Sequence, residues 1–443
     1  MATRFLNKKT HKFYFFSNSG QRKHYVLTFG DEINTRSGAA PSGSDFKRIE
    51  YRGRLGEWKP PPVVSKRSME MYFLDVGQGD AAFVVTPNNT KILVDGGLHD
   101  RALGFLIWKY RLDIPGNEVT IDHLFLSHAD KDHVHGLVPL LNHSQITVNN
   151  IYHNGIGLFD SGFNTKIGNK SADGTLTTLH SSLADLDGLD LASGRQAVFF
   201  DWIEEVKNSG ANYRRLDVTD GHLDIGDPEI TFEVVGPVLE ADGQSLRWFG
   251  DKAHTINGHS LVFRITYNFV RTFFSGDLNK KGGEHILSAP NSELLVNAHI
   301  FKAPHHGSHD YSNKLLGAVN PMVSIVSSGE VSDHGHPRAI FLGALGKAGR
   351  GDEPMVFSTE IAALFVDDGD EEAVAHSNSE TTFADLNFEQ SEANTEARQR
   401  FKKLLPGIIN VRTDGENSYA FRRVQQGYQW EAYGPIAPVQ SST

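Results

Sequence analysis

Apolar and polar residues alternate along this chain in patterns that predict short buried strands joined by loops and helices. Apolar runs at 71–76 and 82–85 flank the tight turn Gly77-Gln78-Gly79 and predict a pair of strands. The next apolar run, 91–94, ends in Asp95 and a glycine turn, and residues 101–110 have the spacing of an amphipathic helix. Polar residues at strand ends favour an α/β domain whose site is built on loops.

Residues 1–66 have a different pattern from the rest of the chain. Strand-like alternation predicts three strands there, at 12–16, 24–29 and 47–51. Residues 27–33 followed by 51–58 resemble bacterial SH3-like barrels, and a plain β-rich extension of the main domain is the equal alternative. Pro60-Pro61-Pro62 would then be a stiff linker.

Residues 67–443 are predicted to form the main domain, with two insertions. The first insertion, near 154–222, has helical patterns at 177–189 and 197–209 and is either a lid over the site or a neutral addition. The second, near 365–395, is polar and predicts a solvated excursion.

Composition limits the possible metal ligands and indicates the cellular compartment. Hydrophobic residues at 39% and charged residues at 22% are typical of a globular protein, and no apolar run is long enough for a membrane span. With no apolar signal-peptide core near the N-terminus, we expect a cytoplasmic protein without a membrane partner. Cysteine is absent, so metal ligands must be imidazole, carboxylate, amide or water. The net charge of −11 argues against a protein that coats nucleic acid non-specifically.

The segment 127–133, Ser-His-Ala-Asp-Lys-Asp-His, concentrates four metal-type ligands directly after an apolar strand. His128 and Asp130 stand at alternate positions, and Asp132 and His133 are adjacent. Side chains spaced in this way can point at two metal centres from a single turn. The mixture of imidazole and carboxylate suits a pair of Zn²⁺ or Mn²⁺ ions.

Three later segments also place metal-competent groups where apolar strands end. Asp277 follows the strand pattern 270–274, and its carboxylate could bridge two ions. Tandem His305 and His306 precede a Gly-Ser turn, and His336 lies in a later loop. Adjacent residues usually point apart, so only one of the tandem histidines is expected to bind metal.

Seven ordered motifs in this chain resemble the metallo-β-lactamase fold. More narrowly, they resemble the metal-dependent hydrolase domain of ComEC-type competence proteins and its free-standing relatives. The match runs from about residue 70 to 360, with a final strand pair near 408–423. The motifs are Leu74–Asp80, Val94–Gly97, Ser127–His133, Asn257–Val262, Ser275–Asp277, Pro304–Ser308 and Gly335–Pro337.

This resemblance implies a four-layer αββα sandwich with a site for two divalent metal ions at one edge of the sheets. His128 and Asp130 would hold one ion. Asp132 and His133 would hold the second together with one of the tandem histidines, and Asp277 would bridge. The wider superfamily most often has His where Asp130 stands, so this chain follows the ComEC-like branch.

The resemblance also assigns roles around the ions. The tandem histidine that does not bind metal, His305 or His306, would contact substrate or support a ligand. His336 could stabilise charge or protonate the leaving oxygen. The ligand of the superfamily's third motif has no clean equivalent. His259 lies near that place but out of register, and Asn257 is the alternative.

Four further residues have roles that the sequence leaves open. Asp75, Asp80 and Asp95 could orient ligating histidines or accept a proton from the attacking water, and for Asp75 and Asp80 a turn carboxylate is equally expected. His135 stands where the branch usually has glycine, and is either an extra substrate contact or an exposed side chain.

The sequence leaves three functions open. The first is a metal-dependent phosphodiesterase, a nuclease that acts on DNA or RNA. The second is a small-molecule phosphoester hydrolase such as a phosphocholine esterase, which a narrow pocket would favour. The third is a non-catalytic module whose N-terminal region recruits a protein partner, and the complete set of candidate ligands argues against it.

Overall fold

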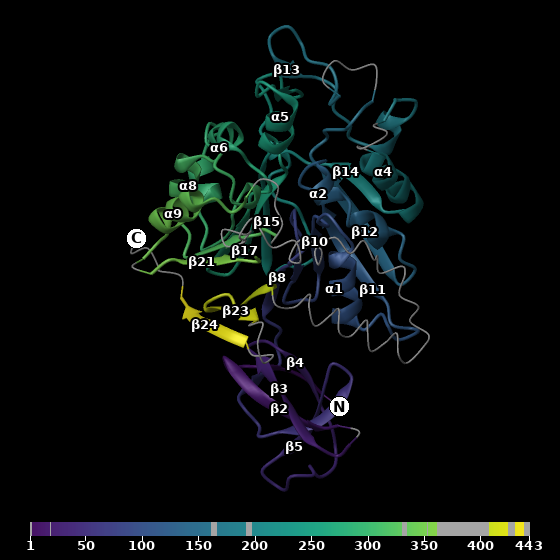
Figure 1. Ribbon diagram of the computed structural model, residues 1–443, viewed down its shortest axis with the longest axis vertical. Coiled ribbons are helices and arrows are strands. Elements are labelled where there is room, and N and C mark those ends of the chain that lie inside the picture. Colours follow the sequence, from purple (N-terminus) through teal and green to yellow (C-terminus); the bar gives the residue numbers. More distant parts are fainter. Residues whose placement is uncertain are drawn as a thin grey trace, which may run out of the picture.

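The computed structural model describes residues 2–17, 19–160, 166–191, 197–329, 335–351, 353–360, 407–423 and 430–437. They form a mixed α/β structure in which a small N-terminal sheet lies at one end of the molecule and two larger sheets form its body (Figure 1). The insertion predicted near 365–395 lies outside the described residues.

The N-terminal sheet has seven strands in the order β3-β2-β6-β5-β4-β1-β7. The strands are β1 (Thr3–Leu6), β2 (Thr10–Phe16), β3 (Arg22–Thr28), β4 (Glu32–Thr35), β5 (Lys47–Tyr51), β6 (Arg54–Trp58) and β7 (Val63–Val64). One face of the sheet packs into a core of its own, formed by Leu6, Phe13, Phe15, Leu27, Ile49 and Trp58. The predicted β-rich region is confirmed, and its likeness to an SH3 barrel and its boundary at residue 66 stay predictions.

The larger of the two main sheets has nine strands in the order β14-β12-β11-β10-β9-β8-β22-β23-β24. Its strands are β8 (Met69–Phe73), β9 (Ala82–Val85), β10 (Lys91–Val94), β11 (Val119–Phe125), β12 (Ile146–His153), β14 (Asn212–Arg215), β22 (Ile409–Thr413), β23 (Ser418–Arg423) and β24 (Trp430–Ile436). The predicted β8–β9 pair is antiparallel, whereas β10, β11, β12 and β14 run parallel. The carboxyl ends of β10 and β11 therefore meet at one edge.

The second main sheet has six strands in the order β15-β17-β18-β19-β20-β21. Its strands are β15 (Ile230–Gly236), β17 (Val262–Tyr267), β18 (Val270–Phe274), β19 (Ile300–Lys302), β20 (Val323–Val326) and β21 (Met355–Ser358). A separate short ladder joins β13 (Thr175–Leu176) to β16 (Leu246–Arg247). Because β18, β19 and β20 are parallel, the segments that follow them emerge at the same edge.

Helices cover the outer faces of both sheets, so the predicted four-layer αββα sandwich is confirmed. The nine-stranded sheet is flanked by α1 (Arg101–Tyr110), α2 (Lys131–Val134), α3 (Leu137–Leu141) and α4 (Ala197–Ser209). The six-stranded sheet is flanked by α6 (Lys280–Ile286), α7 (Ser292–Val296), α8 (Asn313–Val319) and α9 (Ala339–Ala348). Helix α5 (Lys252–Gly258) lies beside α6, and its Ile256 packs into the core cluster of the nine-stranded sheet. Of the helices in the described ranges, none is long and apolar enough to cross a membrane. The cytoplasmic location stays a prediction.

Stacked aromatic rings join the inner faces of the two sheets. Phe125 of β11 lies with its ring centroid 4.8 Å from that of Phe232 and 5.1 Å from that of Phe263, both on the opposite sheet. Phe73 and Phe274 make a second stacked pair at 5.9 Å. This buried aromatic core fixes the two sheets face to face, and therefore fixes the loops that meet at their common edge.

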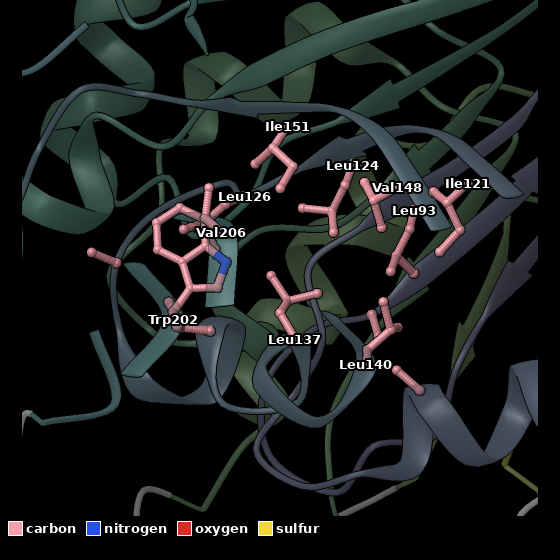
Figure 2. Close-up of a cluster of buried hydrophobic side chains, with 14 of the residues drawn as sticks. Leu93, Ile121, Leu124, Leu126, Leu137, Leu140, Val148, Ile151, Trp202 and Val206 are labelled. Carbon is pink, nitrogen blue, oxygen red and sulfur yellow. The ribbon is translucent and has the colours of Figure 1, made fainter. Parts of the chain in front are cut away.

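The insertion near 154–222 is partly an integral layer of the fold. Figure 2 shows Trp202 and Val206 of α4 beside Leu137 and the sheet residue Ile151, in one buried cluster. The predicted helix at 197–209 is confirmed as α4, which connects the parallel strands β12 and β14.

The predicted helix at 177–189 is wrong. Only Leu183–Leu186 forms a single 3₁₀ turn there, η1. Leucines three residues apart suit the 3₁₀ repeat, and Gly188, with a φ of 76°, ends the turn.

Buried ionic contacts attach the N-terminal sheet to the main sandwich. Arg412 on β22 donates to Asp31 Oδ1 and to the carbonyl oxygen of Phe29, both at 2.8 Å, and to the Tyr72 hydroxyl at 3.2 Å. The Lys9 ammonium also donates to the carbonyl oxygen of Gly434 at 2.9 Å. These contacts join segments far apart in sequence, and they fix the small sheet against the nine-stranded sheet.

Candidate metal centre

The cluster that follows β11 is buried at the edge where the two sheets meet. Asp130 is the N-cap of the short helix α2, with extended φ and ψ, and the turn brings His128 and His133 together. Their ring centroids lie 4.0 Å apart, and both side chains are fully buried. The structure therefore brings two of the four candidate ligands of this segment together, and the prediction that the four point at two metal centres stays a prediction.

Asp277, which follows β18, lies at the centre of the cluster. Its Oδ2 atom is 3.0 Å from His306 Nε2, 3.3 Å from His133 Nε2 and 4.0 Å from His128 Nε2. A Ser260 hydroxyl accepts the backbone N–H of Asp277 at 3.0 Å and holds the turn. One carboxylate thus faces imidazoles from two separate segments of the chain, as a bridging ligand must.

The tandem histidines diverge, as expected for adjacent residues. His306 turns into the cluster, with Nε2 3.4 Å from Asp132 Oδ2 as well as close to Asp277. His305 instead accepts a hydrogen bond from the Asn257 side chain at 3.4 Å, and its ring centroid lies 5.8 Å from that of His336. Both tandem residues have positive φ, 49° and 50°, and this strained turn directs the two rings apart.

Carboxylates behind the cluster orient the two central imidazoles. Asp95 Oδ2 accepts from His133 Nδ1 at 2.9 Å, while its Oδ1 accepts the Ser127 backbone N–H at 2.7 Å. Asp80 Oδ1 lies 3.4 Å from His306 Nδ1, which also donates to the Ser327 carbonyl oxygen at 3.1 Å. With Nδ1 as the donor on both rings, each Nε2 presents its lone pair to the centre.

Asp75, grouped with Asp80 and Asp95 from the sequence, does not reach the cluster. Its Oδ1 atom pairs with Arg101 of α1 at 3.2 Å and accepts the Gly77 backbone N–H at 3.3 Å. For this residue the turn-carboxylate alternative is therefore the better description.

Several polar atoms of the cluster are buried without a hydrogen bond of acceptable geometry, although charged groups lie near them. They include the Nε2 atoms of His128, His133 and His306, the Oδ1 atom of Asp277 and both carboxylate oxygens of Asp80. Such orphaned groups cost free energy unless a ligand satisfies them. Among the described residues, four sets of candidate metal-binding atoms overlap here: His128, His133 and Asp277; Asp132, His133 and His306; Asp80, Asp95 and His133; and Asp80, Asp277 and His306. The donor set therefore fits divalent cations.

One of the predicted ligands, Asp130, stands slightly apart from these sets. Asp130 Oδ2 lies 3.7 Å from His128 Nε2, on the solvent side of the cluster. Asp132 contributes to the set around His306. The predicted division of ligands between two ions stays a prediction, and His133 lies between the two positions rather than clearly at one.

His259 is a correction, because the structure does not bring it to the cluster. Its Nε2 donates to the Arg247 carbonyl oxygen at 2.7 Å, and its ring stacks on Phe249 at 4.6 Å. The end of α5 at Gly258 turns this side chain into the interior. Asn257, two residues earlier, contacts His305 instead and is the residue of this segment that borders the site.

His135 has a structural contact that the sequence did not reveal. Its Nδ1 donates to the Leu98 carbonyl oxygen, and its ring packs edge-on against His99 at 6.2 Å between centroids. It ties the segment after α2 to the loop after β10.

Sequence reasoning also missed Lys302, which is 4% exposed and pairs with Asp80 beneath the cluster. The available signal was a lysine inside the apolar strand 300–303.

The electrostatics of the cluster favour added positive charge at its centre. Burial disfavours the charged forms of His133 and His306, but Asp277 and neighbouring carboxylates more than offset this and raise the pKa of both imidazoles well above the usual value. Burial also opposes ionisation of Asp277, yet His306 and His133 hold its pKa well below the usual value. Burial lowers the pKa of His128 to about 3. The carboxylates therefore favour positive charge at His133 and His306.

Metal affinity is expected to fall as the pH falls. Burial and the neighbouring Asp132 raise the pKa of Asp130 to about 7, so below neutrality this carboxylate holds a proton that a metal ion must displace. Protons on His133 and His306 must leave as well, because the neutral imidazole is the ligand. Each displaced proton weakens apparent affinity by about tenfold per pH unit.

Competition with a chromogenic chelator between about pH 6 and pH 8, using Mn²⁺ and Zn²⁺, measures this dependence. Calorimetry in two buffers of different ionisation enthalpy counts the protons released. An affinity that is constant across this range would contradict the assignment of these residues.

Comparison with known families agrees with this geometry. The family model of the Metallo-beta-lactamase superfamily matches residues 74–321, more than half of the chain. The chain belongs to the metallo-beta-lactamase superfamily. The matched range includes every residue of the cluster from Asp80 to His306 but not His336. The resemblance inferred from the ordered motifs is confirmed.

Among curated proteins, the chain is similar to ComE operon protein 3 of Bacillus subtilis (strain 168). The two are 25% identical over 284 residues, which is 60% of this chain and 29% of that protein. The chain thus spans less than one third of the length of this relative.

Two solved structures are among those to which the chain shows some similarity. The Rm3 metallo-beta-lactamase is 12% identical, covers 53% of this chain and 75% of its own, and has a TM-score of 0.27. A long form RNase Z from yeast is 12% identical, covers 60% of this chain and 38% of its own, and has a TM-score of 0.27.

Membership in the metallo-beta-lactamase superfamily indicates a metal-dependent hydrolase. His128, His133, His306 and the carboxylates Asp132 and Asp277 would hold divalent ions, with Asp130 completing the open side. Such ions lower the pKa of water toward neutrality and neutralise charge on an attacked phosphoryl or acyl group. The residues of the chain supply the rest: Asp95 and Asp80 fix the ligating rings, and Asn257 fixes His305.

Proposed function

We propose that this protein is a metal-dependent phosphodiesterase that uses two divalent ions, Zn²⁺ or Mn²⁺, to cleave nucleic acid. The observation that carries the proposal is the position of Asp277, whose Oδ2 lies within 4.0 Å of three imidazole nitrogens from two segments. A bridging carboxylate between two ions suits in-line displacement at phosphorus, where both the attacking and the departing oxygen need stabilisation. With no cysteine in the chain, a thiolate ligand is excluded.

Charge balance supports two ions rather than one. Five carboxylates surround the centre, the ammonium of Lys302 pairs with Asp80, and Lys252 interacts electrostatically with Asp130. When ionised, the carboxylates carry five negative charges, and the two lysines leave three of them, more than a single divalent cation neutralises. The carboxylates are Asp80, Asp95, Asp130, Asp132 and Asp277.

Two observations, one structural and one from sequence resemblance, support an anionic substrate. Lys252, half-buried in the first turn of α5, interacts electrostatically with Asp130 and with Lys166, so positive charge lies at the open side. The motifs shared with the competence-protein hydrolase domain also favour nucleic acid over small esters.

His305 and His336 are the candidates to contact the departing group. Their rings are neighbours, with centroids 5.8 Å apart, and burial lowers the pKa of His305, so its imidazole is neutral near pH 7. We assign His305 to hydrogen bonding with a phosphoryl or leaving oxygen, and His336 to proton donation or charge stabilisation at that oxygen.

The test of this function compares three substrates with the metal-supplied protein. Expected are cleavage of labelled DNA or RNA, slower hydrolysis of bis(p-nitrophenyl) phosphate, and full inhibition by EDTA. The substitution Asp132→Ala removes one ligand of one ion and is expected to lower kcat/KM by about 10³-fold.

If the Asp132→Ala variant still cleaved nucleic acid, the assignment of the site would be contradicted. Efficient turnover of phosphocholine esters without cleavage of nucleic acid would instead favour a small-molecule esterase. Less than about one ion per chain after supplying metal, together with no hydrolysis, would support a non-catalytic module that binds a protein partner.

A further inference from the structure

The charge of this chain is divided very unevenly between the N-terminal sheet and the rest. Residues 1–66 contain 13 Lys and Arg against 5 Asp and Glu. The remaining residues contain 30 basic and 49 acidic side chains. The overall charge of −11 therefore hides a strongly basic N-terminal region attached to an acidic sandwich. A polyanion would be attracted to the former and repelled by the latter.

One face of the N-terminal sheet presents cations and aromatic rings together. In β2, Lys12, Tyr14 and Phe16 alternate with the buried Phe13 and Phe15, so they share the opposite face. The register pairs Tyr14 with His24 and Phe16 with Arg22 on β3, which places these four side chains on that face. Lys12, Arg22 and His24 are exposed, and Phe16 is 47% exposed.

Cation–π contacts extend this face toward the loop before β5. The Arg22 guanidinium lies 4.0 Å from the centroid of Tyr14 and 5.0 Å from that of Phe46. The Lys59 ammonium lies 5.6 Å from Phe46, whose ring meets Tyr14 edge-on at 6.0 Å. Glu57, the acidic residue of β6 on this face, is buried and paired with Arg22 at 2.9 Å. We call Lys12, Tyr14, Phe16, Arg22, His24, Phe46 and Lys59 the cationic face.

We propose that the cationic face binds single-stranded nucleic acid. Spaced cations track a phosphate backbone, and exposed rings give unpaired bases a surface for stacking. Buried contacts such as Arg412 with Asp31 hold the sheet against the sandwich, so this face has a fixed position relative to the metal centre.

The cationic face and the metal centre lie toward opposite ends of the molecule. Figure 1 shows β2 and β3 at one end, whereas α2 and α5, which border the centre, lie toward the other. A small ester cannot contact both places, but an extended strand can. This inference deepens the proposed function and rests on it for the fate of the bound strand, whereas binding itself does not depend on catalysis.

Binding is tested with the full chain in EDTA, by fluorescence anisotropy of labelled single-stranded DNA and RNA and of a duplex, across a salt series. Expected is binding to single strands that weakens with salt, and weaker binding to the duplex. The double substitution Lys12→Gln/Lys59→Gln is expected to reduce the log–log salt slope by about 1.4 and the affinity by about 10- to 30-fold near 0.1 M salt.

A second variant separates stacking from charge. Phe16→Ser is expected to weaken binding by about 5-fold or more while leaving the salt slope unchanged. The matched control Lys314→Gln/Lys347→Gln removes two exposed lysines from α8 and α9 and is expected to leave both affinity and slope unchanged.

Three results would overturn the proposal. They are no binding to single-stranded DNA or RNA, a loss of affinity in the control variant equal to that in Lys12→Gln/Lys59→Gln, and duplex binding as tight as single-strand binding. Hydrolysis of bis(p-nitrophenyl) phosphate by the metal-loaded chain tests the proposed function separately. Hydrolysis of this ester without binding of single-stranded nucleic acid would contradict only the inference about the cationic face. Binding of single strands without hydrolysis would contradict only the proposed function.

Discussion

Replacing Asp277 with asparagine is expected to lower kcat/KM for a phosphodiester by about 10⁴-fold, or about 5 kcal/mol of transition-state stabilisation. The substitution keeps the shape of the side chain but removes the charge that faces His128, His133 and His306 at 3.0–4.0 Å. A larger effect than that of Asp132→Ala follows, because Asp277 would contact both ions. Metal content is expected to fall from about two ions per chain to one or fewer.

Steady-state kinetics with bis(p-nitrophenyl) phosphate and elemental analysis of the same preparation measure the two effects together. The matched control is Asp224→Asn, which changes an exposed turn carboxylate that accepts the Gly226 N–H at 2.8 Å. Its activity and metal content are expected to match those of the unmodified chain. If Asp277→Asn kept both ions and most of its activity, the carboxylate would not be a bridge.

Local patterns predicted most of the fold because burial in this sandwich is nearly complete along the central strands. Residues 69–73 and 82–85 are buried throughout, and such apolar runs mark strands clearly. The motif segments also lie at strand ends, where parallel strands direct them to one edge. That geometry is why Ser127–His133, Asp277 and His306 could be predicted to meet.

Sequence reasoning failed where long-range packing decided the outcome. His259 has the residue type of a ligand, but the end of α5 and the ring of Phe249 direct it inward. The choice between His305 and His306 depended on the positive φ of both, and no pattern of residue types encodes it. The net charge also gives no sign of the uneven distribution, because it averages two parts of the chain that have opposite sign.

The acidic metal centre and the basic cationic face have complementary roles in the proposed function. In the proposed function, the carboxylates that would hold divalent ions would also repel a nucleic acid substrate around the centre. A basic sheet attached through Arg412 would then attract the strand at a distance from the ions. An acidic metal centre and a basic binding face would therefore be compatible parts of one proposed nuclease.

Lys302→Met is expected to lower the free energy of unfolding of the metal-free protein by about 3–5 kcal/mol. Lys302 is 4% exposed, and its ammonium pairs with Asp80 and lies 3.4 Å from the Gly276 carbonyl oxygen, next to Asp277. Loss of the cation leaves Asp80 buried with no ammonium partner among the carboxylates of the site. Methionine fills a similar volume, so the charge, rather than a cavity, accounts for the effect.

The double variant Lys302→Met/Asp80→Asn separates the ion pair from packing. Removing both charges is expected to restore at least half of the lost stability, because replacing a whole buried pair costs far less than removing one partner. Urea denaturation in EDTA measures all three variants, with Lys314→Met on the exposed face of α8 as the control, expected within about 0.5 kcal/mol of the unmodified chain. If the double variant were less stable than Lys302→Met alone, Asp80 would be held by His306 and its backbone neighbours rather than by the lysine. The Lys302 ammonium would then act mainly through its hydrogen bond to the Gly276 carbonyl oxygen, which stabilises the turn that positions Asp277.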